Sequence, residues 1–284
     1  MQVPWYEPET NMNMYQHNFF DYYIDKLDEI FLKFHVSLNF VSIGACDGQA
    51  EDASISSFMR KNNWNGLFVE PMSLNHRDFK NLLESKNATE RAFLLHAAAN
   101  ETCTNATIKF TRPNAEEKQG LQSDHWIRRQ IGHIYTAHDA YDPNQIIENV
   151  RCMTFPDILK AWSSHLNEKA PNNPHQIIRP HAVKVDTEGN DYFILKSLLK
   201  SFHAMFSSRM LPFLILWECK MIGEALYKDL KTLLARKNYA VSGYGNDCFA
   251  ILKQKAKGIR EKNERSKEGK GEIKKHGIFG GLLG

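Results

Sequence analysis

The feature that most constrains the fold is a short apolar run that ends abruptly in acidic residues. Residues 183–185 read Val-Lys-Val, and Asp186, Glu188 and Gly189 follow almost at once. A buried strand that ends in carboxylates and turns through glycine into a helix is typical of an open α/β sheet, where sites form at the carboxyl ends of the strands. We therefore predict a strand at 183–186, a helix after it, and a site between them.

The rest of the chain alternates in the same way between apolar strand patterns and helical patterns. We predict further strands at residues 39–43, 66–70, 91–99, 149–153 and 211–217, an extra strand at 107–111, and a final antiparallel pair within 239–252. Helical apolar spacing follows most of these strands and also covers residues 18–35. This order predicts an α/β fold with a doubly wound, mostly parallel sheet and an antiparallel edge.

Glycines and acids punctuate the ends of the predicted strands. Gly44 and Gly48 follow the first strand, where glycine lets the backbone approach a ligand closely. Glu70 ends the second strand, the position at which an acid binds ribose hydroxyls in Rossmann-like folds. Ser73 is expected to cap the next helix. Glu218 ends the strand after Asp186, so both acids lie at adjacent strand ends.

Charge and periodicity divide the chain into segments. We predict an N-terminal helical extension at 1–38, one domain at 39–252 with an insertion or substrate loop at about 112–149, and a tail at 253–284. The tail holds ten Lys or Arg and four Glu up to residue 275, which leaves 26 basic and 29 acidic groups before it. The domain is therefore slightly acidic, and this argues against a generally basic, nucleic-acid-binding surface.

Cysteine usage and the termini bear on the compartment. The chain has five cysteines without a C-x-x-C pair, so the simplest interpretation is free thiols in a reducing compartment. No secretory signal or membrane-spanning run is visible, and we expect a cytoplasmic protein. Asn87, Asn100 and Asn105 begin N-glycosylation sequons, which we interpret as chance matches.

Four motifs together resemble those of the FkbM-type methyltransferases. They are the glycine segment at 40–48 (FVSIGACDG), Val-Glu-Pro at 69–71, the segment at 150–159 that opens a helix, and Lys-Val-Asp-Thr-Glu-Gly at 184–189. They occur in the family's order and spacing over residues 39–252. This sequence departs from the family at Ser42, where the family has an acid, and at Cys46, where it has asparagine.

The resemblance implies a Rossmann-like class I methyltransferase fold with seven strands, S-adenosylmethionine as cofactor and methyl transfer to an oxygen. The acceptor would be a hydroxyl on a sugar, a glycan or a small molecule, with no nucleic acid and an oligomeric state left open. The cofactor-binding residues it implies are Gly44, Asp47, Gly48, Glu70, Ala97 and Ala98. Ser123 and His125 lie in a segment similar to one near the family's pocket and are assigned to the substrate.

Asp186 and Glu188 are the candidate catalytic residues. Methyl transfer requires the acceptor oxygen to be aligned and its proton removed, and a carboxylate at the end of the strand can do either. Asp186 and Glu218 are also candidate ligands for Mg²⁺, which prefers oxygen donors.

Three alternatives remain at this stage. A binding or scaffold module with a degenerate site is motivated by Ser42 and Cys46. A nicotinamide-dependent oxidoreductase shares the strand, glycine turn and acid, but the chain lacks G-x-G-x-x-G spacing. A nucleic-acid methyltransferase is disfavoured by the acidic domain and by the absence of an Asn-Pro-Pro-Tyr-like run.

Overall fold

The structure is a computed structural model that describes residues 16–48, 53–103, 106–113, 133–134, 145–169, 178–187, 189–205, 211–244 and 247–253. All of these belong to one compact unit, Tyr6–Lys253. The predicted division into an extension, a domain and a tail stays a prediction, although the first helix packs directly against the sheet through Tyr23 and Phe249.

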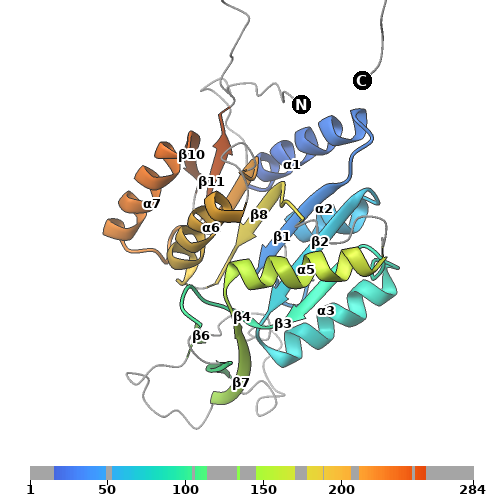
Figure 1. Cartoon of the computed structure of the whole chain (residues 1–284), viewed down its shortest axis with the longest axis vertical. Coiled ribbons are helices and arrows are strands. Elements are labelled where there is room, and N and C mark those ends of the chain that lie inside the picture. The colour runs from blue at the N-terminus through green and yellow to red at the C-terminus, as the bar shows by residue number, and fades with distance from the viewer. Residues whose placement is uncertain are drawn as a thin grey trace, which may run out of the picture. The chain divides into compact units, whose positions relative to one another are not determined.

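A seven-stranded sheet forms the centre of this unit, in the order β10-β11-β9-β8-β1-β2-β3 (Figure 1). Its strands are β1 Leu38–Ile43, β2 Trp64–Glu70, β3 Ala92–His96, β8 Ala182–Val185, β9 Leu214–Glu218, β10 Tyr239–Tyr244 and β11 Asp247–Leu252. Neighbours pair in parallel except at β11, which runs antiparallel to both β9 and β10. The antiparallel strand therefore lies one place in from the edge. This order and these directions are those of a doubly wound, Rossmann-like α/β sheet.

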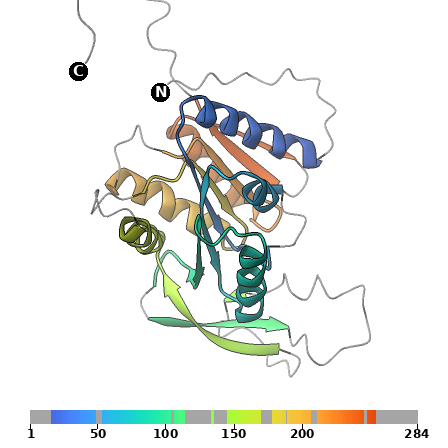
Figure 2. The ribbon, with the colours of Figure 1, turned by 90° about the vertical axis from the view of Figure 1, so that its right-hand side faces the viewer.

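Helices cover both faces of the sheet. They are α1 Gln16–Lys33, α2 Ala53–Arg60, α3 Ser73–Ser85, α5 Phe155–Lys169, α6 Asp191–Met205 and α7 Glu224–Arg236. Figure 2 shows α1, α2 and α3 on one side of the sheet and α5 and α6 on the other. Alternate residues of each strand thus face different helices, and both sets must be apolar.

The two faces are packed in different ways. On the side of α5, α6 and α7, aliphatic side chains of the strands, such as Val41 and Val183, join Trp162 and Leu195 in one buried cluster. On the other side the core is aromatic, with Phe68 of β2 in edge contact with Phe58 and Phe79 at centroid distances of 4.8 and 4.9 Å. Full burial of a side chain of this size contributes roughly 1.5–3 kcal/mol.

A second sheet extends from the carboxyl edge of the main one. It contains β4 Ala98–Ala99, β5 Thr107–Pro113, β6 His133–Ile134 and β7 Gln145–Met153, in the order β4-β7-β5-β6. The single strand predicted at 91–99 is wrong in this respect, because it divides between the two sheets where Ala98 pairs with Cys152. The predicted extra strand at 107–111 is confirmed, and the strand predicted at 149–153 starts earlier, within the expected loop.

A polar contact fixes the second sheet to α3. Glu148 of β7 accepts hydrogen bonds from the backbone N–H and the hydroxyl of Ser73, at 3.1 and 2.9 Å. The expectation that Ser73 caps its own helix is therefore wrong: Met72 occupies the cap position and makes no side-chain cap bond. A carboxylate from another sheet satisfies the N-terminus of the helix, where negative charge is favourable.

Four of the five cysteines form two disulfides, so the expectation of free thiols is wrong for all but Cys46. Cys103 bonds to Cys152 and Cys219 bonds to Cys248, across sequence separations of 49 and 29 residues. Strand pairing causes both. Cys152 lies on β7 beside the segment that follows β4, and Cys248 lies on β11 opposite the end of β9.

Replacing Cys103 and Cys152 together by Ser is expected to lower the free energy of unfolding by about 2–4 kcal/mol. The cross-link closes a long loop, and removing it increases the entropy of the unfolded chain. Urea denaturation of the wild type and the double variant under non-reducing conditions measures the loss. The matched control is the Cys219→Ser and Cys248→Ser pair, whose shorter loop predicts a smaller loss. A Cys103/Cys152 variant as stable as the wild type would contradict the bond.

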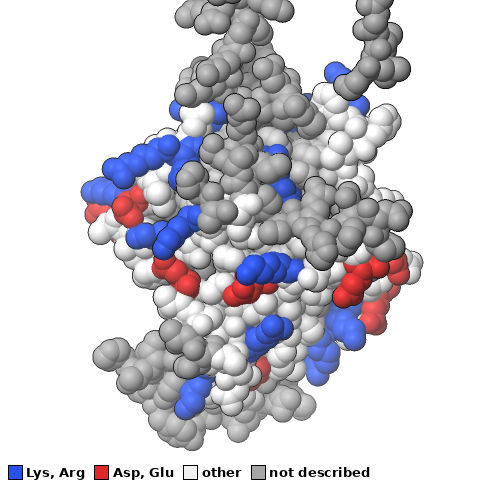
Figure 3. Space-filling view, viewed as in Figure 1, with Lys and Arg blue, Asp and Glu red and all other residues white. Residues whose placement is uncertain are grey.

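The surface in Figure 3 carries both signs of charge, with basic and acidic side chains interspersed among the described residues of that face. Lys160 and Asp157 of α5, for example, form an exposed pair at 3.4 Å. None of the helices in the described part of the chain combines the length and the apolar character needed to cross a lipid bilayer.

Candidate active site

The candidate site lies where the strand order of the sheet reverses. From β1 the chain adds β2 and β3 on one side of the sheet, and it then returns to add β8 and β9 on the other side of β1. Ligands of open α/β folds bind outside the carboxyl ends of strands at such a switch point. The ends of β1, β2 and β8 bring together Gly44, Glu70 and Asp186, as the sequence predicted.

The turn after β1 is held against both of its neighbours. The backbone N–H groups of Gly44 and Ala45 donate to the Val69 carbonyl at 2.9 and 3.1 Å, and the Asp186 N–H donates to the Ile43 carbonyl at 2.9 Å. Gly44 has φ +79°, and a Cβ added to it would overlap the carbonyl oxygen of Asp186. Only glycine allows β1 and β8 to approach each other this closely at their carboxyl ends.

The same turn contains two more residues with positive φ. Gly48 has φ +72°, and a Cβ there would overlap the Phe79 ring of α3. Cys46 has φ 53°, a left-handed conformation that asparagine adopts more readily than cysteine. Burial, with the charges of Glu70 and Asp47, raises the pKa of the Cys46 thiol to about 12. The thiol therefore stays protonated near neutral pH and is a poor nucleophile.

Glu70 is buried, with 2% of its surface exposed, and both carboxylate oxygens accept backbone N–H groups. The donors are Met72 at 2.9 Å and Cys46 at 2.8 Å. Glu70 therefore joins the glycine turn to the start of α3. Burial raises its pKa to about 7, although the two N–H donors oppose the shift. Its expected role at the ribose hydroxyls stays a prediction.

This buried carboxyl predicts a pH dependence of stability. The pKa of Glu70 is raised from 4.5 to about 7 in the folded state. The contribution of Glu70 to the free energy of unfolding is therefore fully present below pH 4.5 and is lost as the pH rises to about 7. Across that pH range the free energy of unfolding of the wild type is expected to fall by on the order of 3 kcal/mol because of this group, and the Glu70→Gln variant should not show that fall. Urea denaturation at several pH values measures it, with exposed Glu224→Gln as control. A difference between wild type and Glu70→Gln that is constant with pH would contradict this.

Asp186 forms an ion pair with Lys184, two residues back on the same strand. The Lys184 Nζ lies 2.9 Å from Asp186 Oδ2, and 36% of the Asp186 side chain is exposed. Ser42 pairs with Lys184 in the parallel register, so both side chains lie on one face of the sheet. An acid at position 42 would lie on the same face as Lys184 and would compete with Asp186 for it.

The loop after Asp186 is organised by a buried carboxylate that the sequence analysis missed. Asp191, the first residue of α6, accepts hydrogen bonds at Oδ2 from the Thr187 N–H, the Thr187 hydroxyl and the Gly189 N–H, at 3.3, 3.0 and 3.3 Å. Burial and the charge of Asp186 raise its pKa to about 6, against the Thr187 bonds. An acid directly after a Gly-Asn turn at the start of a helix was the available signal.

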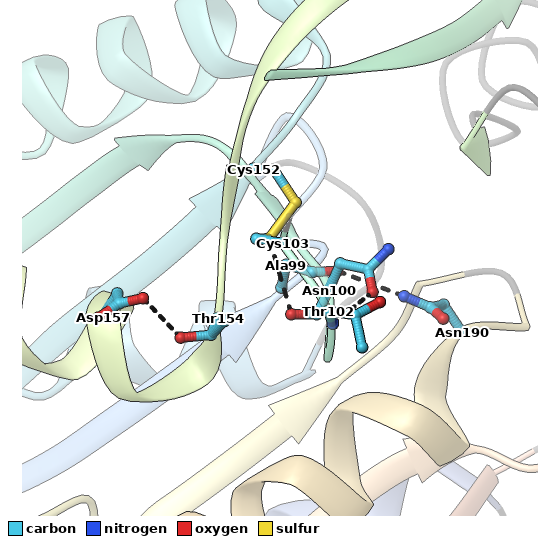
Figure 4. The surroundings of a disulfide bond; sticks show 8 residues. All are labelled: Ala99, Asn100, Thr102, Cys103, Cys152, Thr154, Asp157 and Asn190. Atoms are coloured by element: carbon cyan, nitrogen blue, oxygen red, sulfur yellow. Dashed lines mark hydrogen bonds between the residues drawn. A yellow bond between two sulfur atoms is a disulfide. The ribbon is translucent and has the colours of Figure 1, made fainter. Parts of the chain in front are cut away.

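The alanines after β3 lie beside this loop. Ala97 and Ala98 are buried, at 0% and 3% exposure, and Ala98 packs with Met72 in a small apolar cluster. Asn190 donates through Nδ2 to the Ala99 carbonyl at 3.3 Å (Figure 4). This bond connects the predicted adenine side of the site to the loop that follows Asp186. Contact of the two alanines with adenine stays a prediction.

Of the remaining predicted site residues, three are not described and one lies in the glycine turn. Glu188, Ser123 and His125 lie outside the described residues. Asp47 lies in the glycine turn, partly buried. Among the described residues, no group of three or more His, Cys, Asp or Glu side chains is arranged to hold a metal ion. Lys184 already pairs with Asp186, so the predicted Mg²⁺ site at Asp186 and Glu218 has no support.

No protein-family model and no curated protein matches the chain. Among solved structures, it is similar to the FkbM methyltransferase of Methylobacillus flagellatus KT, at 15% identity and a TM-score of 0.44 over 76% of this chain and 44% of that one. The chain thus spans less than half of that protein's length.

Two further similarities are to methyltransferases of other kinds. One is precorrin-6y C5,15-methyltransferase of Geobacter metallireducens GS-15, at 11% identity and a TM-score of 0.36 over 77% of this chain and 81% of that one. The other is the N-terminal domain of human METTL16 in complex with SAH, at 9% identity and a TM-score of 0.39 over 82% and 69%. We assign the fold from the strand order and directions, not from these similarities.

Proposed function

We propose that this protein is an S-adenosylmethionine-dependent methyltransferase that methylates a hydroxyl oxygen of a sugar, a glycan or a small molecule. The observation that carries the proposal is the junction of Gly44 with Asp186 at the switch point of the sheet, beside the buried Glu70. A ligand bound there would rest against exposed backbone on one side and carboxylates on the other.

The charge of the site supports a cationic cofactor over a dinucleotide. Four acids, Asp47, Glu70, Asp186 and Asp191, lie at or shortly after the carboxyl ends of β1, β2 and β8, and Lys184 pairs with Asp186. A sulfonium is attracted to such a site, whereas the pyrophosphate of a nicotinamide dinucleotide would be repelled. Lys184 and Asp186 of the motif at 184–189 lie at the same end of the sheet, and a nicotinamide-dependent oxidoreductase does not account for that motif.

The residues present fit the cofactor in the following way. The turn at 44–48 offers a close backbone approach, Glu70 provides acceptors for ribose hydroxyls, and the alanines after β3 leave room for the adenine. When bound, S-adenosylmethionine supplies an electrophilic methyl group. Magnesium is given no part in this proposal.

Asp186 is the residue we assign to the acceptor. Its partly exposed carboxylate at the end of β8 accepts the hydrogen bond of the acceptor hydroxyl and takes its proton during transfer. Lys184 holds that carboxylate in one orientation through the 2.9 Å contact. Asp191 fixes the following loop, which contains Glu188, the second candidate. The segment at 112–149, with Ser123 and His125, is the proposed acceptor-selecting region.

The decisive experiment has two stages. Titration calorimetry with S-adenosylmethionine first measures binding, and we expect a saturable heat signal that a Gly44→Ala variant lacks. A screen of glycans and small hydroxyl compounds with labelled S-adenosylmethionine, read by mass spectrometry, then identifies a product heavier by one methyl group. Binding without transfer to any acceptor would favour the degenerate binding module. Absence of binding would contradict the proposal.

A further inference from the structure

The two disulfides change the interpretation of the sequons. Disulfides form and persist in oxidising compartments and are rare where thiols are kept reduced. A chain in which Cys103–Cys152 and Cys219–Cys248 are both bonded therefore fits secretory folding better than the cytoplasm we expected. In that compartment, Asn-X-Thr sequons meet the enzymes that glycosylate them.

The sequon at Asn87 is well presented. Asn87 and Thr89 are exposed, whereas Ala88 between them is buried at 0% exposure and anchors the turn. Asn87 follows the end of α3 with φ 51°, and its backbone N–H donates to the Glu84 carbonyl at 3.1 Å. The turn is thus fixed by its backbone and by Ala88, while both side chains that define the sequon face solvent.

The position of Asn87 in the fold is compatible with a large substituent. Helix α3 starts at the carboxyl edge of the sheet, after Glu70, and its 13 residues run back to the opposite edge. At 1.5 Å per residue, that separates its two ends by about 20 Å. An oligosaccharide on Asn87 would therefore stand at the edge away from Gly44 and Asp186.

The other sequons are less suited. Asn100 is only partly exposed, and its Oδ1 accepts the Thr102 N–H at 3.0 Å. It lies beside the Cys103–Cys152 disulfide and the Asn190 contact, at the edge that carries the candidate site (Figure 4). Asn105 lies outside the described residues. Asn87 is therefore the site that fold and accessibility favour.

We propose that Asn87 is an N-glycosylation site and that the protein folds in an oxidising, secretory compartment. The reaction joins Asn87 Nδ2 to the anomeric carbon of an oligosaccharide carried on a lipid pyrophosphate. The bond from that carbon to the pyrophosphate oxygen breaks, the lipid pyrophosphate leaves with the electron pair, and one amide proton passes to a base of the transferase. This proposal is independent of the methyltransferase assignment.

The test is secretion of the full chain from cultured eukaryotic cells behind a cleavable signal peptide. Intact mass is measured before and after treatment with peptide N-glycosidase. We expect the wild type to lose one glycan mass on treatment. Asn87→Gln and Thr89→Ala should show no such loss, and Asn100→Gln should match the wild type. Thr89→Ala keeps Asn87 itself, so it separates loss of the sequon from loss of the turn.

Two results would overturn the proposal. One is a secreted wild type with no enzyme-sensitive mass. The other is a mass loss that persists in both Asn87→Gln and Thr89→Ala. Alkylation of the denatured wild type checks the compartment: five cysteines less the four in disulfides leave one labelled thiol without reductant, and five after reduction. Labelling of all five without reductant would also overturn it.

Discussion

Replacing Asp186 by Asn is expected to lower kcat for methyl transfer about 10²- to 10⁴-fold, the usual contribution of a positioned acid or base. Asparagine has the same shape, but it cannot take the proton of the acceptor hydroxyl. It also removes the charge that pairs with Lys184 at 2.9 Å. Because the Asp186 backbone N–H still donates to the Ile43 carbonyl, the strand end and the cofactor turn should keep their structure.

The measurement combines turnover of an acceptor found in the screen with calorimetry of cofactor binding. We expect kcat to fall while the Kd for S-adenosylmethionine changes less than about threefold, within roughly 0.7 kcal/mol. The matched control is Asp25→Asn on α1. This substitution breaks another ion pair with a lysine, because Asp25 Oδ1 lies 3.0 Å from Lys61 Nζ. It should leave both values unchanged. An Asp186→Asn enzyme with wild-type kcat would remove Asp186 from the proposed chemistry.

Gly44→Ala is expected to abolish measurable cofactor binding and to destabilise the fold. The added Cβ would overlap the Asp186 carbonyl oxygen, and φ +79° is unfavourable for an alanine. Relief requires β1 and β8 to separate at their ends, which would break the Asp186 N–H to Ile43 carbonyl bond. A left-handed non-glycine residue alone costs on the order of 1–3 kcal/mol, so the total loss should exceed about 2 kcal/mol.

Urea denaturation measures this loss, and calorimetry measures the affinity for S-adenosylmethionine. Gly223→Ala is the matched control. Gly223 precedes α7 with φ −57°, and a Cβ there would meet nothing within 4 Å. It should therefore be close to neutral. If the Gly44→Ala protein had the wild-type free energy of unfolding and the wild-type Kd for S-adenosylmethionine, the close contact with Asp186 would not be needed for folding or for cofactor binding.

The two variants separate binding from chemistry. Gly44→Ala acts on the turn that would hold the cofactor, whereas Asp186→Asn acts on the acceptor side of the same junction. If neither affects activity, the site lies elsewhere in the molecule. If Asp186→Asn alone is silent, the second acid of the loop, Glu188, becomes the candidate base.

Much of the fold followed from local sequence patterns. The apolar runs that became β1, β2, β8 and β9 have lengths and β-branched content that fit buried parallel strands, and each ends in glycine or an acid. Their order along the chain predicts the doubly wound sheet and places Gly44, Glu70 and Asp186 at one edge. That inference needs only the rule that parallel strands share their carboxyl edge.

The contacts that determine the chemistry did not follow from these patterns. Asp191 has no assigned role in the sequence prediction, yet it accepts three hydrogen bonds from the loop after Asp186. Glu148 caps α3 from 75 residues away in sequence. For Glu148 no local pattern shows the donor, because that contact depends on how the second sheet docks.

The sequence by itself thus determined the strand and helix order and the acids at the strand ends, because hydrophobic periodicity and glycine positions are local properties of the chain. Only the tertiary structure decided the two disulfides, the overlap that reserves position 44 for glycine, and the pairing of Lys184 with Asp186. Strand register brings the two cysteine pairs and the Gly44–Asp186 contact together, and register is set by the packing of the whole sheet.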